Sequence, residues 1–280
     1  MTNKLIFIDV DGTLCNDYGM VPSSAKLAIQ KAQANGHQIY LCTGRSKAEI
    51  TEEIAALPFD GMIGAGGGYI ETKAGILYHE TFNEADLQAI VHFFNENKIG
   101  YYLESNHGLF KSQYCVSEME KQMYSGLDPA SEAYQKLKEG TKGFFDLLQP
   151  EPPFEELTDV NKISFIHATY PFQEVADRFG DRFTIMQTTV PAFGQNSGEI
   201  VLPGINKELA IIRLLEYLER PKTDTIAIGD GHNDLEMLQF VNYGVAMGNA
   251  QEALKQVADE ITETHDEDGI HNFFERYGLI

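Results

Sequence analysis

Residues 5–10 form a short and almost continuous apolar run, which is followed by acidic and glycine residues. Strands that helices cover on both faces have this pattern, because both rows of their side chains are buried. A helical pattern begins near Pro22 and stops at Asn35-Gly36, a pair typical of a helix C-terminus. Residues 38–43 then predict a second strand. This β-α-β order predicts a parallel sheet, and such sheets bind ligands beyond the carboxyl ends of their strands.

The alternation continues after the second predicted strand. Ser46 and Glu49 have the spacing of a capping box, which predicts a helix that runs to about Leu57. Residues 61–64 resemble the end of a third strand. At about residue 65 the pattern changes, and the next strands no longer alternate with helices.

The middle of the chain predicts a hairpin and, from about residue 83, an inserted unit of a different kind. Residues 69–72 and 76–80 flank Lys73-Ala74-Gly75 in the manner of an antiparallel hairpin. Helices and strands are then mixed, with helices at 84–97 and 116–137 and strands at 99–104, 162–167 and 183–188. This mixture predicts an α+β unit.

The α/β alternation returns after residue 191. It comprises strands at 199–202, 225–228 and 244–247 and helices at 206–218, 234–240 and 252–257. The two outer segments can therefore form one domain. We expect an α/β fold, with a doubly wound parallel-sheet (Rossmann-like) core of residues 1–82 and 191–280 and an inserted α+β cap domain of residues 83–190.

Composition indicates a folded chain and restricts its partners. Of the 280 residues, 43% are hydrophobic and 22% are charged, as in globular proteins. A loose guide of roughly 150 residues per domain suggests two domains. The formal net charge of −21 repels nucleic acid and anionic lipid, so we expect neither nucleic acid nor a membrane as a partner.

The sequence also indicates a compartment. The N-terminal apolar run reaches a charge at Asp9, too early for the apolar core of a signal peptide, and no stretch approaches the roughly 18 uncharged apolar residues of a membrane helix. The cysteines Cys15, Cys42 and Cys115 are scattered and odd in number, so they predict no disulfide framework. We therefore expect a cytoplasmic protein, and the sequence leaves its oligomeric state open.

Two acidic residues, Asp9 and Asp11, follow the first strand beside Gly12. Alone, they suit an ordinary solvated turn, since Asp and Gly are common turn formers. They also suit catalysis, because one carboxylate can be a nucleophile while the other transfers protons at one phosphorus or carbonyl centre. An aspartyl nucleophile needs a cation to approach an anionic phosphoryl group.

A second acidic cluster contains Asp230 and Asp234 and follows a later buried strand. Acidic residues before a helix are often only caps. However, Asp9, the main-chain carbonyl of Asp11 and Asp230 would supply the hard oxygen ligands that Mg²⁺ prefers. Asp234 suits either a cap or a partner for a lysine. His232 suits a surface loop better than a catalytic base.

Two further segments offer groups that bind phosphate. Thr43-Gly44 follows the second strand, where a hydroxyl and the amides of a helix N-terminus can hold a phosphate. Arg45 suits either added charge or a surface ion pair. Lys207 begins a predicted helix, and it can present its ammonium to phosphate or be an ordinary exposed lysine.

Four segments in this order resemble the four motifs of the haloacid dehalogenase-like (HAD) superfamily: DVDGTL from Asp9, CTGR from Cys42, NKELA from Asn206 and GDGHNDLEML from Gly229. With the later segments at 247–250 and 268–270, they are similar to the Cof-type hydrolases. That branch carries an α/β cap between the second and third motifs, and the insert at 83–190 fits it.

The resemblance implies roles for the two aspartates of the first motif. Asp9 would attack phosphorus, and Asp11 would protonate the leaving oxygen and then activate water on the aspartyl-phosphate. Dehalogenases of the superfamily lack the second aspartate and use no metal. The presence of Asp11 therefore indicates phosphoryl transfer.

The resemblance also implies binding residues. The phosphoryl oxygens would be bound by Thr43, Gly44, Lys207 and Asn233, and the metal set would be Asp9, Asp11, Asp230 and Asp234. Within that set Asp230 and Asp9 would ligate Mg²⁺, while Asp234 would orient Lys207 or reach a metal-bound water. The positive charge of Lys207 and Mg²⁺ would offset the acidity of the chain.

One loop departs from the family pattern. Cof-type chains often have an Asn-Gly-Ala-like turn after the third strand, whereas this chain has Ala65-Gly66-Gly67-Gly68. These glycines can bring backbone amides close to a substrate or form a flexible domain junction.

The sequence thus predicts a Mg²⁺-dependent phosphatase of small phosphorylated metabolites, such as sugar phosphates, nucleotides or phosphorylated cofactors. We expect cap residues, in the regions 101–124 and 188–193, to set specificity. A sugar phosphomutase and a non-catalytic phosphometabolite-binding protein are the alternatives. Release of inorganic phosphate would distinguish the phosphatase from both alternatives.

Overall fold

Strand β1 (Leu5–Ile8) lies inside a large sheet, and all of its side chains are buried. Its neighbours β2 (Gln38–Cys42) and β12 (Thr225–Gly229) both run parallel to it. The strand is apolar throughout because side chains on both faces of the sheet are covered. The computed structural model describes residues 3–16, 19–188 and 190–280.

The large sheet has eight strands in the order β14-β13-β12-β1-β2-β3-β4-β5. Its other members are β3 (Gly61–Gly64), β4 (Tyr69–Thr72), β5 (Gly75–His79), β13 (Tyr243–Ala246) and β14 (Glu260–Ile261). The strands from β14 to β3 are parallel, whereas β4 and β5 form an antiparallel hairpin beside β3. The predicted hairpin is confirmed, and it extends this sheet.

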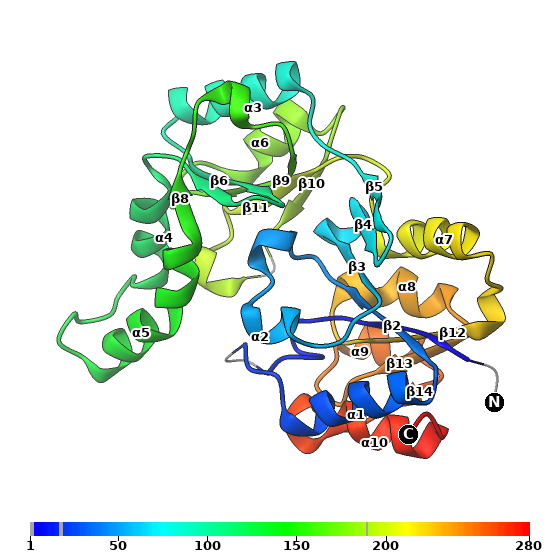
Figure 1. Cartoon of the computed structure of the whole chain (residues 1–280). Coiled ribbons are helices and arrows are strands. Elements are labelled where there is room, and N and C mark those ends of the chain that lie inside the picture. Colours follow the sequence, from blue (N-terminus) through cyan, green and yellow to red (C-terminus); the bar gives the residue numbers. More distant parts are fainter. Residues whose placement is uncertain (1–2, 17–18, 189) are drawn as a thin grey trace. The chain divides into compact units, whose positions relative to one another are not determined.

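Helices pack on both faces of the large sheet (Figure 1). They are α1 (Ser23–Ala34), α2 (Glu52–Ala55), α7 (Lys207–Leu218), α8 (Leu235–Phe240), α9 (Glu252–Lys255) and α10 (Gly269–Tyr277). Short 3-10 turns occur at η2 (Ala65–Gly67), η5 (Lys222–Asp224), η6 (His232–Asp234) and η7 (His265–Glu267). Helix α1 packs against α10 and α7 packs against α8, so the predicted doubly wound arrangement is confirmed.

The predicted helix from Ser46 to Leu57 is wrong. The backbone N–H and the hydroxyl of Ser46 both donate to the Glu49 carboxylate, but only a 3-10 turn, η1 (Lys47–Glu49), follows. A separate helix then begins at Thr51. The side chain of Thr51 accepts a hydrogen bond from the N–H of Ile54 and caps the single-turn helix α2, so the segment is not one continuous helix.

A second sheet has six strands in the order β10-β11-β9-β6-β7-β8. They are β6 (Gly100–Ser105), β7 (Leu109–Lys111), β8 (Leu148–Pro150), β9 (Val160–Ile166), β10 (Thr184–Gln187) and β11 (Gly198–Val201). All pairings are antiparallel except that of β7 with β8. Residues of α3 (Glu84–Glu96) and α6 (Phe172–Phe179) share one apolar cluster with the strands, and α4 (Cys115–Met123) and α5 (Glu132–Leu147) contribute to another. Two more 3-10 turns lie at η3 (Phe154–Glu156) and η4 (Pro191–Phe193).

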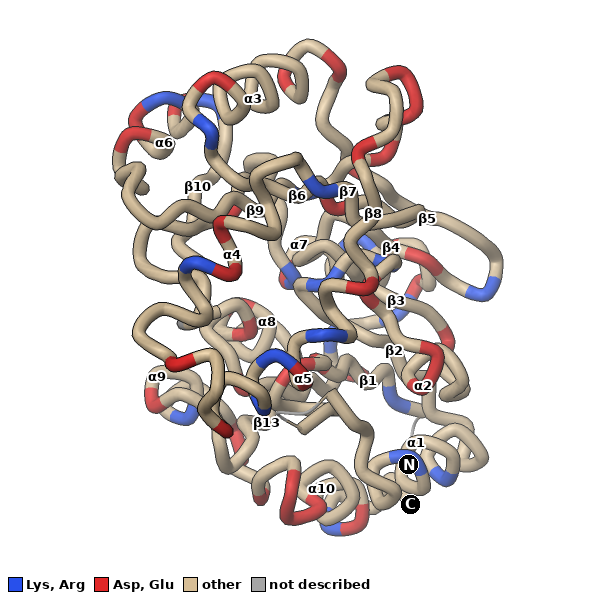
Figure 2. Tube along the Cα trace, turned by 90° about the vertical axis from the view of Figure 1, so that its left-hand side faces the viewer, with Lys and Arg blue, Asp and Glu red and all other residues tan. Residues whose placement is uncertain are grey.

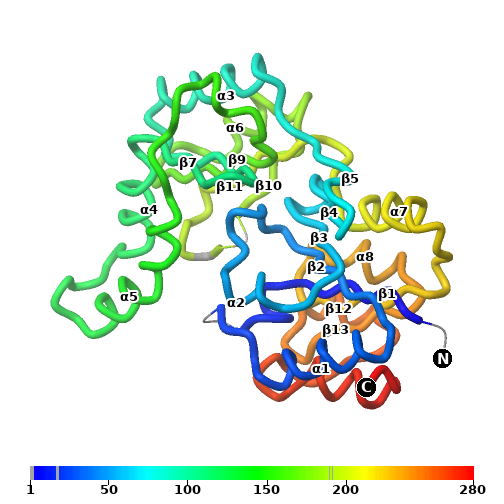
Figure 3. The backbone as a smooth tube through the Cα atoms, viewed as in Figure 1, coloured from blue at the N-terminus to red at the C-terminus, as the bar shows by residue number. Residues whose placement is uncertain are grey.

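Contacts divide the chain into two compact units. The first contains Met1–Arg45, Ile50–His79 and Gly204–Ile280, and the second contains Ser46–Glu49 and Glu80–Pro203. Figure 3 follows the chain from the first unit in blue, through the second in green, and back to the first in orange and red. Figure 2 shows acidic residues along surface helices of both units, interspersed with Lys and Arg.

The predicted assignment of residues 199–202 to the outer domain is wrong. Strand β11 pairs antiparallel with β9 and with β10, so it belongs to the second sheet. The expected boundary at residue 190 accordingly falls inside the second unit, which continues to Pro203. A short apolar strand carries no signal for which sheet it joins, because its partners come from distant parts of the chain.

The predicted helix over residues 116–137 is also wrong. Helix α4 ends at Met123, and α5 begins only at Glu132. Gly126, with φ of 75°, lies between them, and Ser131 caps α5 by accepting from the N–H of Tyr134. A left-handed glycine and a new cap both end the helical pattern.

The second sheet contains an ionic group around the buried Glu104 that the sequence did not predict. Lys162 lies 3.0 Å from a carboxylate oxygen of Glu104 and 3.5 Å from one of Glu199. Ser164 donates to the other Glu104 oxygen at 2.7 Å. Burial raises the pKa of Glu104 to about 8, although Lys162 acts in the opposite direction. Charged residues in otherwise apolar strands were the signal for this group.

The length and hydropathy of the helices show whether any of them could span a membrane. Within residues 3–16, 19–188 and 190–280, no helix combines the length and the apolar character needed to cross a bilayer.

Candidate active site

The first unit gathers the predicted site residues at one edge of its sheet. Asp9 follows β1, Thr43 follows β2 and Asp230 follows β12. Because these three strands are parallel neighbours, their carboxyl ends meet at the same edge. Lys207 is the first residue of α7, whose N-terminus is capped by the side chain of Asn206.

Lys207 is buried between two aspartates. Its ammonium nitrogen lies 2.6 Å from Asp9 Oδ1 and 2.6 Å from Asp234 Oδ1. Only 1% of the surface of Lys207 is exposed, so it is not an ordinary exposed helix lysine. Burial lowers the pKa of Lys207, but the carboxylates of Asp234 and Asp9 outweigh burial and raise this pKa above its usual value. The ammonium is therefore a fixed positive charge beside Asp9.

Asp234 binds the lysine, as its position suggested, and it also accepts from the loop before it, but it makes no side-chain cap bond to α8. Its Oδ1 binds Lys207, while its Oδ2 accepts hydrogen bonds from the N–H groups of Asp230 at 3.1 Å and Gly231 at 3.0 Å. The same carboxylate thus holds the loop after β12 and the lysine of α7. His232, in the same loop, is exposed, as expected of a surface residue.

Three carboxylates form a cluster that suits a hard cation. Asp9, Asp230 and Asp234 each offer an oxygen, and these oxygens lie within 4.8 Å of one another. Burial and the charge of Asp234 raise the pKa of Asp9, although Lys207 lowers it. Burial raises the pKa of Asp230 to about 6, against the hydrogen bond from Thr13. Added positive charge would stabilise these ionised carboxylates, so the donor set fits Mg²⁺.

The carboxylate of Asp11 lies outside this cluster. Arg45 holds it with two hydrogen bonds, from Nε to Oδ2 at 2.9 Å and from Nη2 to Oδ1 at 2.6 Å. The side chain of Asp11 is 64% exposed. Of the two roles considered for Arg45, the structure shows the ion pair, and the partner is Asp11.

The predicted phosphate-binding residues lie around the loop after β2. The buried hydroxyl oxygen of Thr43 accepts from the N–H of Arg45 at 3.1 Å. A Cβ added at Gly44 would lie 3.6 Å from the side-chain nitrogen of Asn233, so the structure brings these two residues together. Asn233 itself is exposed.

The turn of the first motif has two further contacts that sequence reasoning missed. The Thr13 hydroxyl donates to Asp230 Oδ1 at 2.7 Å, and the Asn249 amide donates to the carbonyl of Gly12 at 2.8 Å. These bonds tie residues near Asp9 to the loops after β12 and β13. Both residues lie in motif segments of the sequence, but residue type alone did not reveal their partners.

Gly12→Ala should lower the kcat/KM for phosphate release at least tenfold. Gly12 has φ of +76°, and an added Cβ would lie 2.3 Å from Asp230 Oδ2, so the carboxylate must move. Gly204→Ala is a matched control, because Gly204 has φ of +72° and nothing lies within 4 Å of its added Cβ. We expect both variants to lose about 1 kcal/mol or more of stability from backbone strain, but only Gly12→Ala to lose activity and Mg²⁺ affinity. Equal activities would contradict the role of this turn.

The glycine loop packs within the first unit. Gly67 has φ of +114°, and a Cβ there would lie 2.2 Å from the carbonyl oxygen of Asn206. Glycine is required at this position because the backbone of η2 approaches the start of α7. The loop therefore supports the helix that carries Lys207.

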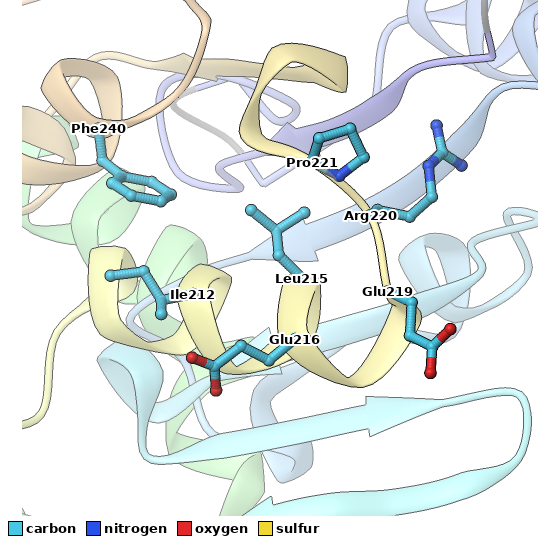
Figure 4. Close-up of a pocket in the computed structure, with 7 residues that line it drawn as sticks. All are labelled: Ile212, Leu215, Glu216, Glu219, Arg220, Pro221 and Phe240. Atoms are coloured by element: carbon cyan, nitrogen blue, oxygen red, sulfur yellow. The ribbon is translucent and has the colours of Figure 1, made fainter.

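A shallow hollow of about 540 Å³ lies elsewhere in the first unit (Figure 4). Its lining residues are Ile212, Leu215, Glu216, Glu219, Arg220, Pro221 and Phe240. None of the predicted site residues lines it. The chemistry instead centres on the acidic cluster and Lys207.

Known proteins share this arrangement of segments. A family model described as haloacid dehalogenase-like hydrolase matches residues 6–274. The chain belongs to this family. The hydrolase is 25% identical over 280 residues to the putative phosphatase YkrA of Bacillus subtilis (strain 168), which covers all of both chains. It is also 25% identical over 271 residues to the 5-amino-6-(5-phospho-D-ribitylamino)uracil phosphatase YcsE of the same organism, which covers 95% of this hydrolase and 92% of YcsE.

A solved structure shows the same fold as this hydrolase. The HAD subclass IIB sugar phosphatase BT4131 matches it with a TM-score of 0.74 and 25% identity, covering 99% of the hydrolase and 100% of BT4131. The predicted family and fold class are thus confirmed, and so is the predicted enzyme class, a HAD-type phosphatase.

Proposed function

We propose that this hydrolase is a Mg²⁺-dependent phosphatase of small phosphorylated metabolites and works through an aspartyl-phosphate on Asp9. The observation that carries the proposal is the buried ammonium of Lys207 at 2.6 Å from Asp9, beside two further carboxylates. An anionic phosphoryl group can approach a carboxylate only where positive charge offsets the repulsion. Lys207 supplies part of that charge.

The proposed reaction has two steps, in which Asp9 is the nucleophile and Asp11 transfers the protons. A carboxylate oxygen of Asp9 attacks phosphorus, the bond to the leaving oxygen breaks, and Asp11 gives that oxygen a proton. Asp11, now ionised, takes a proton from water as the water attacks the aspartyl-phosphate. Inorganic phosphate leaves, and Asp9 and Asp11 return to their starting states.

The remaining site residues bind the phosphoryl group and the metal. Thr43, Gly44, Asn233 and Lys207 would bind phosphoryl oxygens. Mg²⁺ would be held by Asp9, Asp230 and the main-chain carbonyl of Asp11, and it supplies charge that stabilises the transferring phosphoryl group. Asp234, already bonded to Lys207 and to two amides, would mainly orient the lysine.

The names of two relatives that state a substrate support the substrate class. One acts on a phosphoribityl compound and the other is a sugar phosphatase. We therefore propose sugar phosphates, nucleotides or phosphorylated cofactors as substrates. That the specificity regions 101–124 and 188–193 select the substrate stays a prediction, and Thr189 lies outside the described residues.

A panel of phosphorylated metabolites tests this function. With Mg²⁺ we expect release of inorganic phosphate from several monophosphates, at least about 10²-fold faster than with EDTA, and recovery when Mg²⁺ is added back. Interconversion of sugar phosphates without release of phosphate would identify a mutase. Binding without turnover would identify a phosphometabolite-binding protein, and activity unchanged by EDTA would contradict the metal role.

A further inference from the structure

Arg45 and Asp11 form a two-bond ion pair inside the first unit, with N···O distances of 2.9 Å and 2.6 Å. The planar guanidinium matches both carboxylate oxygens, so it fixes the direction of the carboxylate as well as its distance. Among the described residues, Arg45 is the side chain that hydrogen-bonds to Asp11. An exposed aspartate without such a partner would sample several rotamers.

The other carboxylates of the site are oriented differently. Asp9 and Asp234 bind the buried ammonium of Lys207, and Asp230 accepts from the hydroxyl of Thr13. Asp11 is the exposed member of the group, and its proton transfers depend on where its carboxylate points. Because Arg45 binds both oxygens of this carboxylate, the orientation of Asp11 depends on Arg45.

Arg45 has a fixed backbone from which to orient its partner. Its N–H donates to Thr43 Oγ1 at 3.1 Å, and its carbonyl accepts from the N–H of Ala65 at 2.8 Å. The next residues, Ser46–Glu49, are part of the second unit, where Ala48 packs with an apolar cluster. Arg45 is thus held at the point where the chain passes from one unit to the other.

We propose that Arg45 is a positioning residue for Asp11. It keeps hold of one Asp11 oxygen, while the other oxygen gives up its bond to Arg45 when it takes up the proton and then faces the leaving oxygen of the substrate. The proposal rests on the proposed function, because it concerns the proton that Asp11 gives to the leaving group. Arg45 acts through Asp11 and needs no contact with the phosphoryl group. Loss of Arg45 should therefore matter most when the leaving oxygen needs a proton.

Two aryl phosphates of similar size separate this role from phosphate binding. Nitrophenolate leaves readily without a proton, whereas phenolate is a poorer leaving group. For Arg45→Lys and Arg45→Ala we expect the kcat/KM for phenyl phosphate to fall about 10- to 100-fold, and that for p-nitrophenyl phosphate to fall less than about threefold. The ratio kcat/KM is the measure because it reports transfer to the enzyme and not the later hydrolysis.

A double variant identifies Asp11 as the group through which Arg45 acts. Asp11→Asn should show the same preference for p-nitrophenyl phosphate, and adding Arg45→Ala to Asp11→Asn should change the kcat/KM for phenyl phosphate less than twofold. Equal losses on both substrates, or losses that multiply in the double variant, would overturn the proposal and indicate direct phosphate binding by Arg45.

Arg220→Lys is the matched control. Arg220 also binds an aspartate through Nε and Nη2, in this case Asp224, and it lies at the rim of the hollow in Figure 4, outside the proposed site. Its variant should keep the parent ratio between the two substrates. If the parent enzyme releases phosphate from neither aryl phosphate nor any monophosphate, the proposed function fails. If only the substrate ratio of the Arg45 variants is unchanged, the positioning role alone fails.

Discussion

Asp9→Asn should reduce the rate of phosphate release at least about 10³-fold, because an amide cannot form the aspartyl-phosphate. The variant should still fold. Asp9 is buried and its pKa is raised, mainly by burial, so a neutral side chain of the same shape avoids a buried charge. We expect thermal unfolding within a few degrees of the parent. Phosphate release at saturating Mg²⁺ and a thermal melt on the same preparation measure the two effects.

Asp146→Asn is the control for this change. Asp146 lies on α5 and its side chain is 61% exposed. Its variant should keep parent activity, since it lies outside the proposed site. An Asp9→Asn enzyme that turned over as fast as the parent would exclude Asp9 as the nucleophile.

Lys207→Met should lower both stability and activity. Methionine resembles lysine in length but leaves Asp9 and Asp234 buried without their ammonium. Removing one partner of a buried ion pair costs about 3–5 kcal/mol, so we expect a loss of that size in the free energy of unfolding without Mg²⁺. The kcat/KM for phosphate release should fall at least about 10²-fold, because the fixed charge beside the nucleophile is lost. Urea unfolding and steady-state assays are the measurements.

Lys26→Met and a double variant make the Lys207 test specific. Lys26 pairs with Glu53 at a partly exposed site, where an ion pair contributes only about 0–1 kcal/mol. The double variant Lys207→Met/Asp9→Asn removes one of the two stranded carboxylates, and it should recover part of the stability but none of the activity. A Lys207→Met protein as stable as Lys26→Met would show that the buried charges are not coupled.

The parallel core could be predicted because its signals are local. The buried strand at 5–8 and the helix at 23–34 lie close to their predicted bounds, since apolar runs and end signals such as Asn35-Gly36 are properties of neighbouring residues. The single helices predicted at 46–57 and 116–137 are wrong. Each segment contains a second helix cap, and the latter also contains a left-handed glycine, so each forms two shorter elements. Strand β11 was placed in the wrong sheet because strand pairing is not a local property.

The candidate site was also predicted in part from local signals, while its long-range contacts were not. The motif residues were identified from their types and order, and Asp9, Lys207 and Asp234 do meet. The burial of Lys207, the bond from Thr13 to Asp230 and the pairing of Asp11 with Arg45 were not predicted. Each depends on side chains that are far apart in sequence.

The sequence by itself determined the family of this chain, its α/β class and the residue types available for phosphoryl transfer. Apolar periodicity and motif order depend only on the order of residues in the sequence. Only the tertiary structure decided which carboxylates share a buried ammonium and which one is exposed and held by an arginine. Burial and ion pairing depend on distances between residues such as Asp9 and Lys207, which are separated by 198 positions and meet only in the folded chain.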